Sequence, residues 1–96
     1  MTYRLPEYGT TTLSTRKVGE WMGKPIQAHN FSFNIPSPTP EDVELLRSAA
    51  VARNRFTVIA SHEGRELAVT SYIAAYELSE DGITVAMNDA DFISLT

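Results

Sequence analysis

The chain contains no cysteine, and only two of its 96 residues are histidine. The missing cysteines exclude a disulfide scaffold, thiolate metal sites and a cysteine nucleophile. No run of 18 apolar residues is present, so we expect no membrane-spanning segment and no membrane partner. Residues Met1 to Pro6 begin no apolar stretch of signal-peptide length, which predicts a cytoplasmic protein.

The overall composition is ordinary for a folded protein. Hydrophobic residues make up 43% of the chain, and the net charge is −4. These values disfavour disorder, and a length of 96 residues suits one modest core. We therefore predict a single domain over residues 1–96, in which residues 1–9 form an irregular N-terminal arm because Pro6 and Gly9 interrupt them.

The charge is distributed unevenly along the sequence. Residues 1–37 have a net charge of +2, whereas residues 63–96 have one basic residue against seven acidic ones, a net charge of −6. Phosphates are repelled by such a field, so direct nucleic-acid binding is disfavoured. A basic protein partner would be attracted.

The first third of the chain reads as two strands. Residues 10–18 are rich in threonine and carry Arg16 and Lys17, which is typical of an exposed edge strand. Gly19 and Gly23 bracket residues 20–22 and predict a turn or short bulge there. The following strand ends in the alternating apolar residues of segment 31–35.

One helix is predicted over residues 40–53. Three prolines at 36, 38 and 40 stop the preceding strand, and Thr39 is a suitable N-cap with Pro40 in the first turn. Apolar residues recur along one broad face. Asn54 is a suitable residue for the left-handed position that closes the helix.

The rest of the chain reads as β-structure. Turns are predicted at Glu63–Gly64 and Asp81–Gly82, and residues 67–78 read as one long strand between them. The hairpins over 55–87 would form a meander, followed by a short last strand within 90–95. The fold class is therefore α+β: an antiparallel sheet of about five to six strands with the helix packed on one face.

Catalytic and metal-binding patterns are weak. Ser61, His62 and Glu63 have the residue types of a hydrolytic triad, but neighbouring strand residues point to opposite faces. Asp89 and Asp91 alternate like the start of a calcium loop, yet the glycine and glutamate that complete such a loop are missing. The glycines are too far apart for a phosphate loop. We expect no catalytic residue, no metal and no cofactor.

The leading hypothesis is a small, acidic, non-enzymatic interaction protein. It would bind a basic protein partner and inhibit it by occupying a surface that binds nucleic acid. The predicted contact residues are seven carboxylates and three aromatic anchors: Glu63, Glu66, Glu77, Glu80, Asp81, Asp89, Asp91, Trp21, Tyr72 and Tyr76.

Two alternatives remain open. One is a structural subunit, of a virion or another assembly, that forms homo-oligomers through its sheet edges. The other is a small hydrolase-like enzyme that uses His29 or His62 together with a carboxylate.

Overall fold

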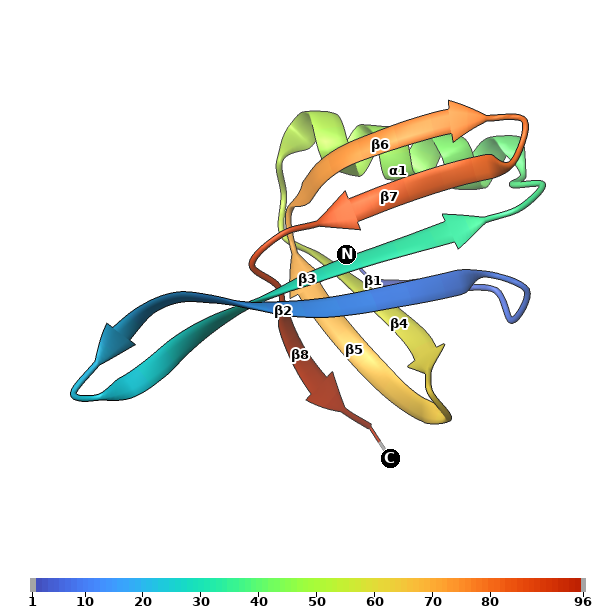
Figure 1. Cartoon of the computed structure of the whole chain (residues 1–96). Coiled ribbons are helices and arrows are strands. Elements are labelled where there is room, and N and C mark those ends of the chain that lie inside the picture. The colour runs from blue at the N-terminus through green and yellow to red at the C-terminus, as the bar shows by residue number, and fades with distance from the viewer. Residues whose placement is uncertain (1, 96) are drawn as a thin grey trace.

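The computed structural model describes residues 2–95 and contains eight strands and one helix over that range. In chain order the elements are β1 (Thr2–Arg4), β2 (Thr10–Trp21), β3 (Lys24–Ile35), α1 (Pro40–Ala52), β4 (Phe56–His62), β5 (Arg65–Ser71), β6 (Ile73–Ser79), β7 (Gly82–Met87) and β8 (Asp91–Ser94). They form two four-stranded sheets (Figure 1): sheet A, in the order β1-β4-β5-β8, and sheet B, in the order β2-β3-β7-β6.

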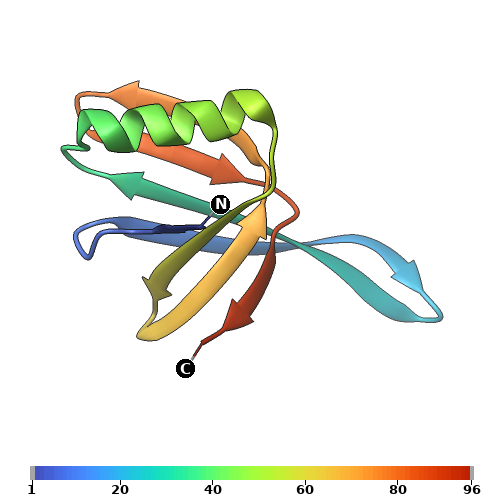
Figure 2. The same ribbon diagram turned by 180° about the vertical axis from the view of Figure 1, so that it is seen from behind.

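The predicted class, α+β with antiparallel strands and one helix on a sheet, is confirmed. Over residues 2–95 the strands number eight rather than about five to six, and they divide between two sheets. Every pairing is antiparallel except that of β1 with β4. Figure 2 shows α1 against β6 and β7, and β4 and β5 across β2 and β3, so the helix and sheet A share one face of sheet B.

The core lies between these layers. Phe31, Phe33 and Ile35 alternate along β3 and are buried, as the sequence pattern predicts. Their register partners on β7 are Met87, Val85 and Ile83, which are also buried. Phe56, Val58, Leu67 and Val69 of sheet A and Leu46 of α1 complete the largest part of the cluster.

Helix α1 begins where the sequence predicts. The Thr39 hydroxyl accepts a hydrogen bond from the Asp42 amide, and the Asp42 carboxylate accepts one from the Thr39 amide, a reciprocal capping box. The helix ends at Ala52, one residue before the predicted end. Arg53, not Asn54, takes the left-handed position, with φ of 53°. In the described part of the chain no helix is long and apolar enough to cross a membrane.

The expectation of an irregular segment over residues 1–9 is wrong for its first part. Thr2–Arg4 forms β1, which pairs in parallel with β4, and the Leu5 amide continues the ladder by donating to the Ile59 carbonyl at 2.8 Å. The Tyr3 ring is buried and stacks on Phe56, with 6.3 Å between ring centroids. A three-residue strand leaves no periodic signal, and its partner lies more than 50 residues away.

Tyr3 provides a test of this docking. Burial, reinforced by the Asp42 carboxylate that accepts its hydrogen bond at 3.2 Å, raises the pKa of Tyr3 above its usual value near 10. The folded state thus holds this proton more tightly than the unfolded state, so its contribution to the free energy of unfolding is present below about pH 10 and declines as the pH rises further. Tyr3→Phe should lose about 1 kcal/mol near neutrality and lack this alkaline decline.

Urea titrations of both proteins, at about pH 8 and about pH 11 and followed by circular dichroism, measure this difference. An equal alkaline loss in the wild type and in Tyr3→Phe would contradict it.

The single strand expected over residues 67–78 is interrupted. The chain leaves sheet A after Ser71 and enters sheet B at Ile73, so β5 and β6 belong to different sheets and the meander over 55–87 does not form. The buried Ser71 hydroxyl donates a hydrogen bond to the Asn88 carbonyl at 2.6 Å, which ties this crossing to the return from β7 to β8. The alternation of side chains continues through Tyr72 in the sequence, so the sequence pattern does not indicate that the chain passes from one sheet to the other there.

The β2–β3 hairpin is longer than predicted. The predicted turn over residues 20–22 lies later in the chain: Glu20 and Trp21 belong to β2, and the turn residues are Met22 and Gly23, with φ of 51° and 78°. Two left-handed residues suit the twist of a tight hairpin. The register shifts between Lys17 and Gly19, so the irregularity near Gly19 is a bulge within the ladder and not its end.

Candidate interaction surfaces

The outer half of the β2–β3 hairpin projects from the body of the molecule (Figure 1), and we call residues 17–28 the arm. β7 pairs with β3 only from Phe31 to Ile35, so the arm is a two-stranded ribbon. In the described chain, the hydrogen bonds and ion pairs of residues 17–28 stay within the hairpin. The molecule consequently measures 48 × 30 × 24 Å.

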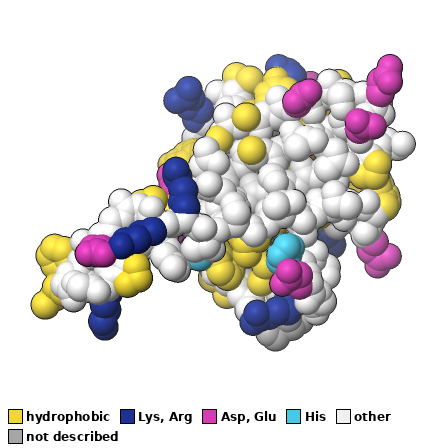
Figure 3. All heavy atoms as spheres, in the orientation of Figure 1, with side chains coloured by type: hydrophobic (Ala, Val, Ile, Leu, Met, Phe, Trp, Pro, Cys, Tyr) yellow, Lys and Arg dark blue, Asp and Glu magenta, His cyan; other side chains and the backbone are white. Residues whose placement is uncertain are grey.

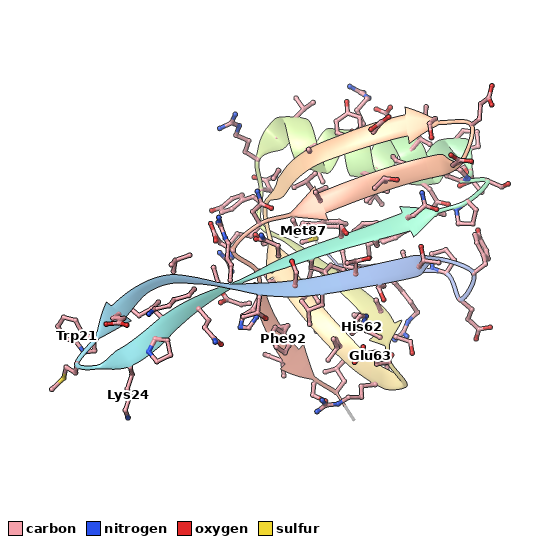
Figure 4. All side chains as sticks on the ribbon, viewed as in Figure 1. Trp21, Lys24, His62, Glu63, Met87 and Phe92 are labelled. Carbon is pink, nitrogen blue, oxygen red and sulfur yellow. The ribbon has the colours of Figure 1, made fainter. Side chains whose placement is uncertain are left out.

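The arm exposes several large apolar side chains. Trp21 is 71% exposed and Met22 is 86% exposed, and Val18 and Ile26 are about half exposed. Figure 4 shows Trp21 and Lys24 together at the tip. Trp21 was among the predicted anchors, whereas Val18, Met22 and Ile26 were not.

A groove of about 790 Å³ lies where the end of α1 meets β6. The helix side contributes Ala50, Val51 and Arg53, and the strand side contributes residues 72–76. Tyr72 and Tyr76, two of the predicted anchors, are both in this lining and partly exposed. The Arg55 guanidinium lies 5.8 Å from the Tyr72 ring centroid, a cation–π contact that holds the ring beside the groove.

The seven predicted carboxylates lie in three groups on the two sheets. Glu63 and Glu66 are at the β4–β5 end, Asp89 and Asp91 flank the link from β7 to β8, and the other three are at the β6–β7 end. Basic residues from the rest of the chain pair with three of them. The ion pairs are Arg4–Glu66 at 2.7 Å, Arg16–Asp89 at 3.5 Å and Arg55–Asp91 at 3.2 Å.

The β6–β7 end keeps an uncompensated negative charge. Glu77, Glu80 and Asp81 form no ion pair with any residue the structure describes, and residues 73–87 contain no lysine or arginine. Figure 3 shows acidic side chains at this end of the molecule, opposite the arm. Glu63 also forms no ion pair with a described residue but lies apart, between β4 and β5, so the seven carboxylates form no single surface and the β6–β7 end holds the largest unpaired group.

Both histidines contact threonines. The Thr11 hydroxyl lies 2.8 Å from His62 Nδ1, and the Thr15 hydroxyl lies 3.0 Å from His29 Nδ1. The His29 ring also meets Phe92 edge-on, with 4.8 Å between ring centroids, near the root of the arm. Over residues 2–95 neither imidazole forms an ion pair with a carboxylate, so the groups of a hydrolytic triad do not converge.

Among the described residues, no group of three or more histidine and acidic side chains could hold a metal ion. The Asp89–Asp91 segment is instead engaged with Arg16 and Arg55.

The fold and its surfaces define a class: a two-layer α+β domain with a projecting apolar hairpin, an apolar groove and one acidic end. Comparison of the chain with protein-family models, with curated proteins and with solved structures finds no match.

Proposed function

We propose that the chain is a non-catalytic subunit that assembles with copies of itself through the arm. The observation that carries this proposal is the exposure of four large apolar side chains on a ribbon that packs against nothing else in the described chain. An isolated two-stranded hairpin is marginal in water and gains stability when its faces are covered. An exposed apolar cluster of this kind is typical of an interaction site.

Open sheet edges support the same proposal. β2 and β6 are the outer strands of sheet B, and β1 and β8 are those of sheet A. Such edges carry unpaired backbone groups that accept a strand from another chain. The arm adds a large aromatic anchor, since a buried tryptophan removes about 150–250 Å² from water, or roughly 4–6 kcal/mol before the entropy of association is subtracted.

Trp21 is the only tryptophan in the chain, so its fluorescence reports directly on the arm. With increasing protein concentration we expect its emission to shift to shorter wavelength and its quenching by acrylamide to decrease. Sedimentation velocity should show larger species over the same range. Trp21→Ala should weaken this self-association by at least about tenfold, because it removes the main apolar anchor.

Tyr8→Ala is the matched control, since Tyr8 is also an exposed aromatic residue but lies outside the arm. This variant should associate like the wild type. A wild-type chain that stays monomeric, with unchanged Trp21 emission, at the highest attainable concentration would overturn the proposal.

A second candidate function is inhibition of a basic partner. The observation in its favour is the uncompensated charge of Glu77, Glu80 and Asp81, which would steer a basic surface, including one that binds nucleic acid, toward the β6–β7 end. Under this candidate the chain remains monomeric in the sedimentation experiment and sediments faster only when the basic partner is added.

A further inference from the structure

We infer that the arm of one copy lies along β6 of a second copy, with Trp21 in the groove beside α1 and the arm's lysines near the carboxylates of the β6–β7 end. This inference rests on the proposed self-assembly and deepens it by naming the surface that receives the arm.

The groove suits an aromatic anchor. Ala50, Ala74 and Ala75 leave its floor open, and Tyr72 and Tyr76 supply aromatic surface around it. A volume of about 790 Å³ accommodates an indole with further side chains of the arm tip. Arg53 in the lining can stack on the inserted indole face, an arrangement that favours tryptophan over other aromatic residues.

The occupant must come from another copy. β2 and β6 are at opposite edges of sheet B, separated by β3 and β7. Both views of the ribbon show the arm leading away from the body that carries α1 and β6 (Figures 1 and 2). A chain therefore presents its own arm and its own groove to two different neighbours.

The charges of the two surfaces are opposite. The arm has Lys17 and Lys24 against Glu20, a net charge of +1, and the β6–β7 hairpin, residues 73–87, has a net charge of −3. The Lys17 ammonium contacts the Glu20 carboxylate, so Lys24 at the tip is the arm's uncompensated cation. Attraction between these surfaces steers the arm to β6 of a neighbour and disfavours arm-to-arm contact.

The lengths of the two surfaces also agree. Trp21 lies four positions after Lys17, about 13 Å along an extended strand, and Glu80 likewise lies four positions after Tyr76. Trp21 placed beside Tyr76 therefore brings Lys17 toward Glu80 and Asp81. Lys24, the register partner of Trp21 at the tip, then lies near Glu77, the residue after Tyr76. β6 pairs only with β7 in the described chain, so its outer edge is open to an added strand.

A contact between two different surfaces of the same chain is heterologous. Such a contact leaves one arm and one groove unused in every dimer, so it closes into a ring or continues as a filament.

A mixing experiment tests this directly. Trp21→Ala removes the anchor and keeps the groove, and Ala74→Arg obstructs the groove and keeps the arm. Each variant alone should be monomeric, and an equimolar mixture should form a 1:1 dimer and nothing larger. Only the Ala74→Arg chain has a tryptophan in this mixture, so a shift of its emission to shorter wavelength reports the arm entering the groove of the other chain.

Ala52→Arg is the control for the bulk and charge of the new side chain, because Ala52 is exposed on α1 outside the groove lining. It should assemble like the wild type, and circular dichroism should show all three variants folded. If Ala74→Arg assembles normally while Trp21→Ala does not, the arm docks elsewhere and the inference is overturned, although self-assembly stands. A monomeric wild type overturns both.

Exchange of charges provides an independent test. Lys17→Glu with Lys24→Glu, and separately Glu80→Lys with Asp81→Lys, should each weaken association by about tenfold at low salt. The variant that combines all four substitutions should regain most of the wild-type association, because the two surfaces are again opposite in sign. A combined variant that associates no better than either double variant overturns the inference.

Discussion

Gly82→Ala is expected to lower the free energy of unfolding by about 4 kcal/mol or more. Gly82 has φ of +106°, and an added Cβ would lie 2.1 Å from the carbonyl oxygen of Ile35 and 2.8 Å from the Cα of Pro36. Both neighbours are backbone atoms, so no side chain can rotate to relieve the contact. β7 would have to move away from the end of β3, which separates the buried Ile83 from its register partner Ile35.

Substitutions at two other glycines distinguish the cost of the left-handed backbone from the cost of the close backbone contact at Gly82. Gly64 has a positive φ of 78° but open space around its Cβ position, so Gly64→Ala should lose only about 1 kcal/mol, from the left-handed backbone. Gly19 has open space and no such φ, so Gly19→Ala should stay within about 0.5 kcal/mol of the wild type. Urea unfolding followed by circular dichroism gives the three values. Similar losses for Gly82→Ala and Gly64→Ala would show that the close backbone approach contributes nothing.

Leu46→Ala should lower the free energy of unfolding by about 2–5 kcal/mol. Leu46 is the fully buried side chain of α1, and with Ala49 it holds the helix on the inner face of sheet B. Its truncation leaves a cavity beneath the helix and loosens the wall of the groove. We therefore expect weaker self-association of the variant even under conditions where it remains folded.

Val51→Ala is the matched control on the same helix. Val51 is 69% exposed, so its truncation should change the free energy of unfolding by no more than about 0.5 kcal/mol. Equilibrium denaturation of both variants measures the difference. A loss for Leu46→Ala no greater than that for Val51→Ala would mean that the helix contributes little to the core.

Features with local causes were predictable from the sequence. The start of α1 follows from Thr39, Pro40 and the acidic first turn, which act within four residues of one another. The Glu63–Gly64 turn forms as predicted because both residues take positive φ, as a two-residue hairpin requires. The alternation of residues 31–35 correctly gave the inner face of β3.

Features with distant causes were not predictable. β1 forms because Tyr3 packs against Phe56 in the folded protein. The passage of the chain from sheet A to sheet B at Tyr72 depends on the position of the second sheet. The distribution of the carboxylates follows from that passage, since β5 and β6 carry theirs to different sheets. The pairing of Arg16 with Asp89 joins positions 73 residues apart in the chain.

The candidate surfaces were recognised in part. Trp21, Tyr72 and Tyr76 were predicted as anchors from their residue type, but no local pattern places the first on the arm and the other two in the groove. The groove itself exists only because the end of α1 meets β6, a contact between segments about 20 residues apart.

The position of Trp21 also determines how the stability of this protein can be observed. Its indole is already largely in water in the folded monomer, at the tip of the arm (Figure 4) and outside the core cluster. Its emission will therefore change little when the monomer denatures, and a flat optical trace during a urea titration is compatible with complete loss of structure. Differential scanning calorimetry or far-ultraviolet circular dichroism will record the unfolding of the core. The fluorescence of Trp21 then reports only the contact with neighbouring chains.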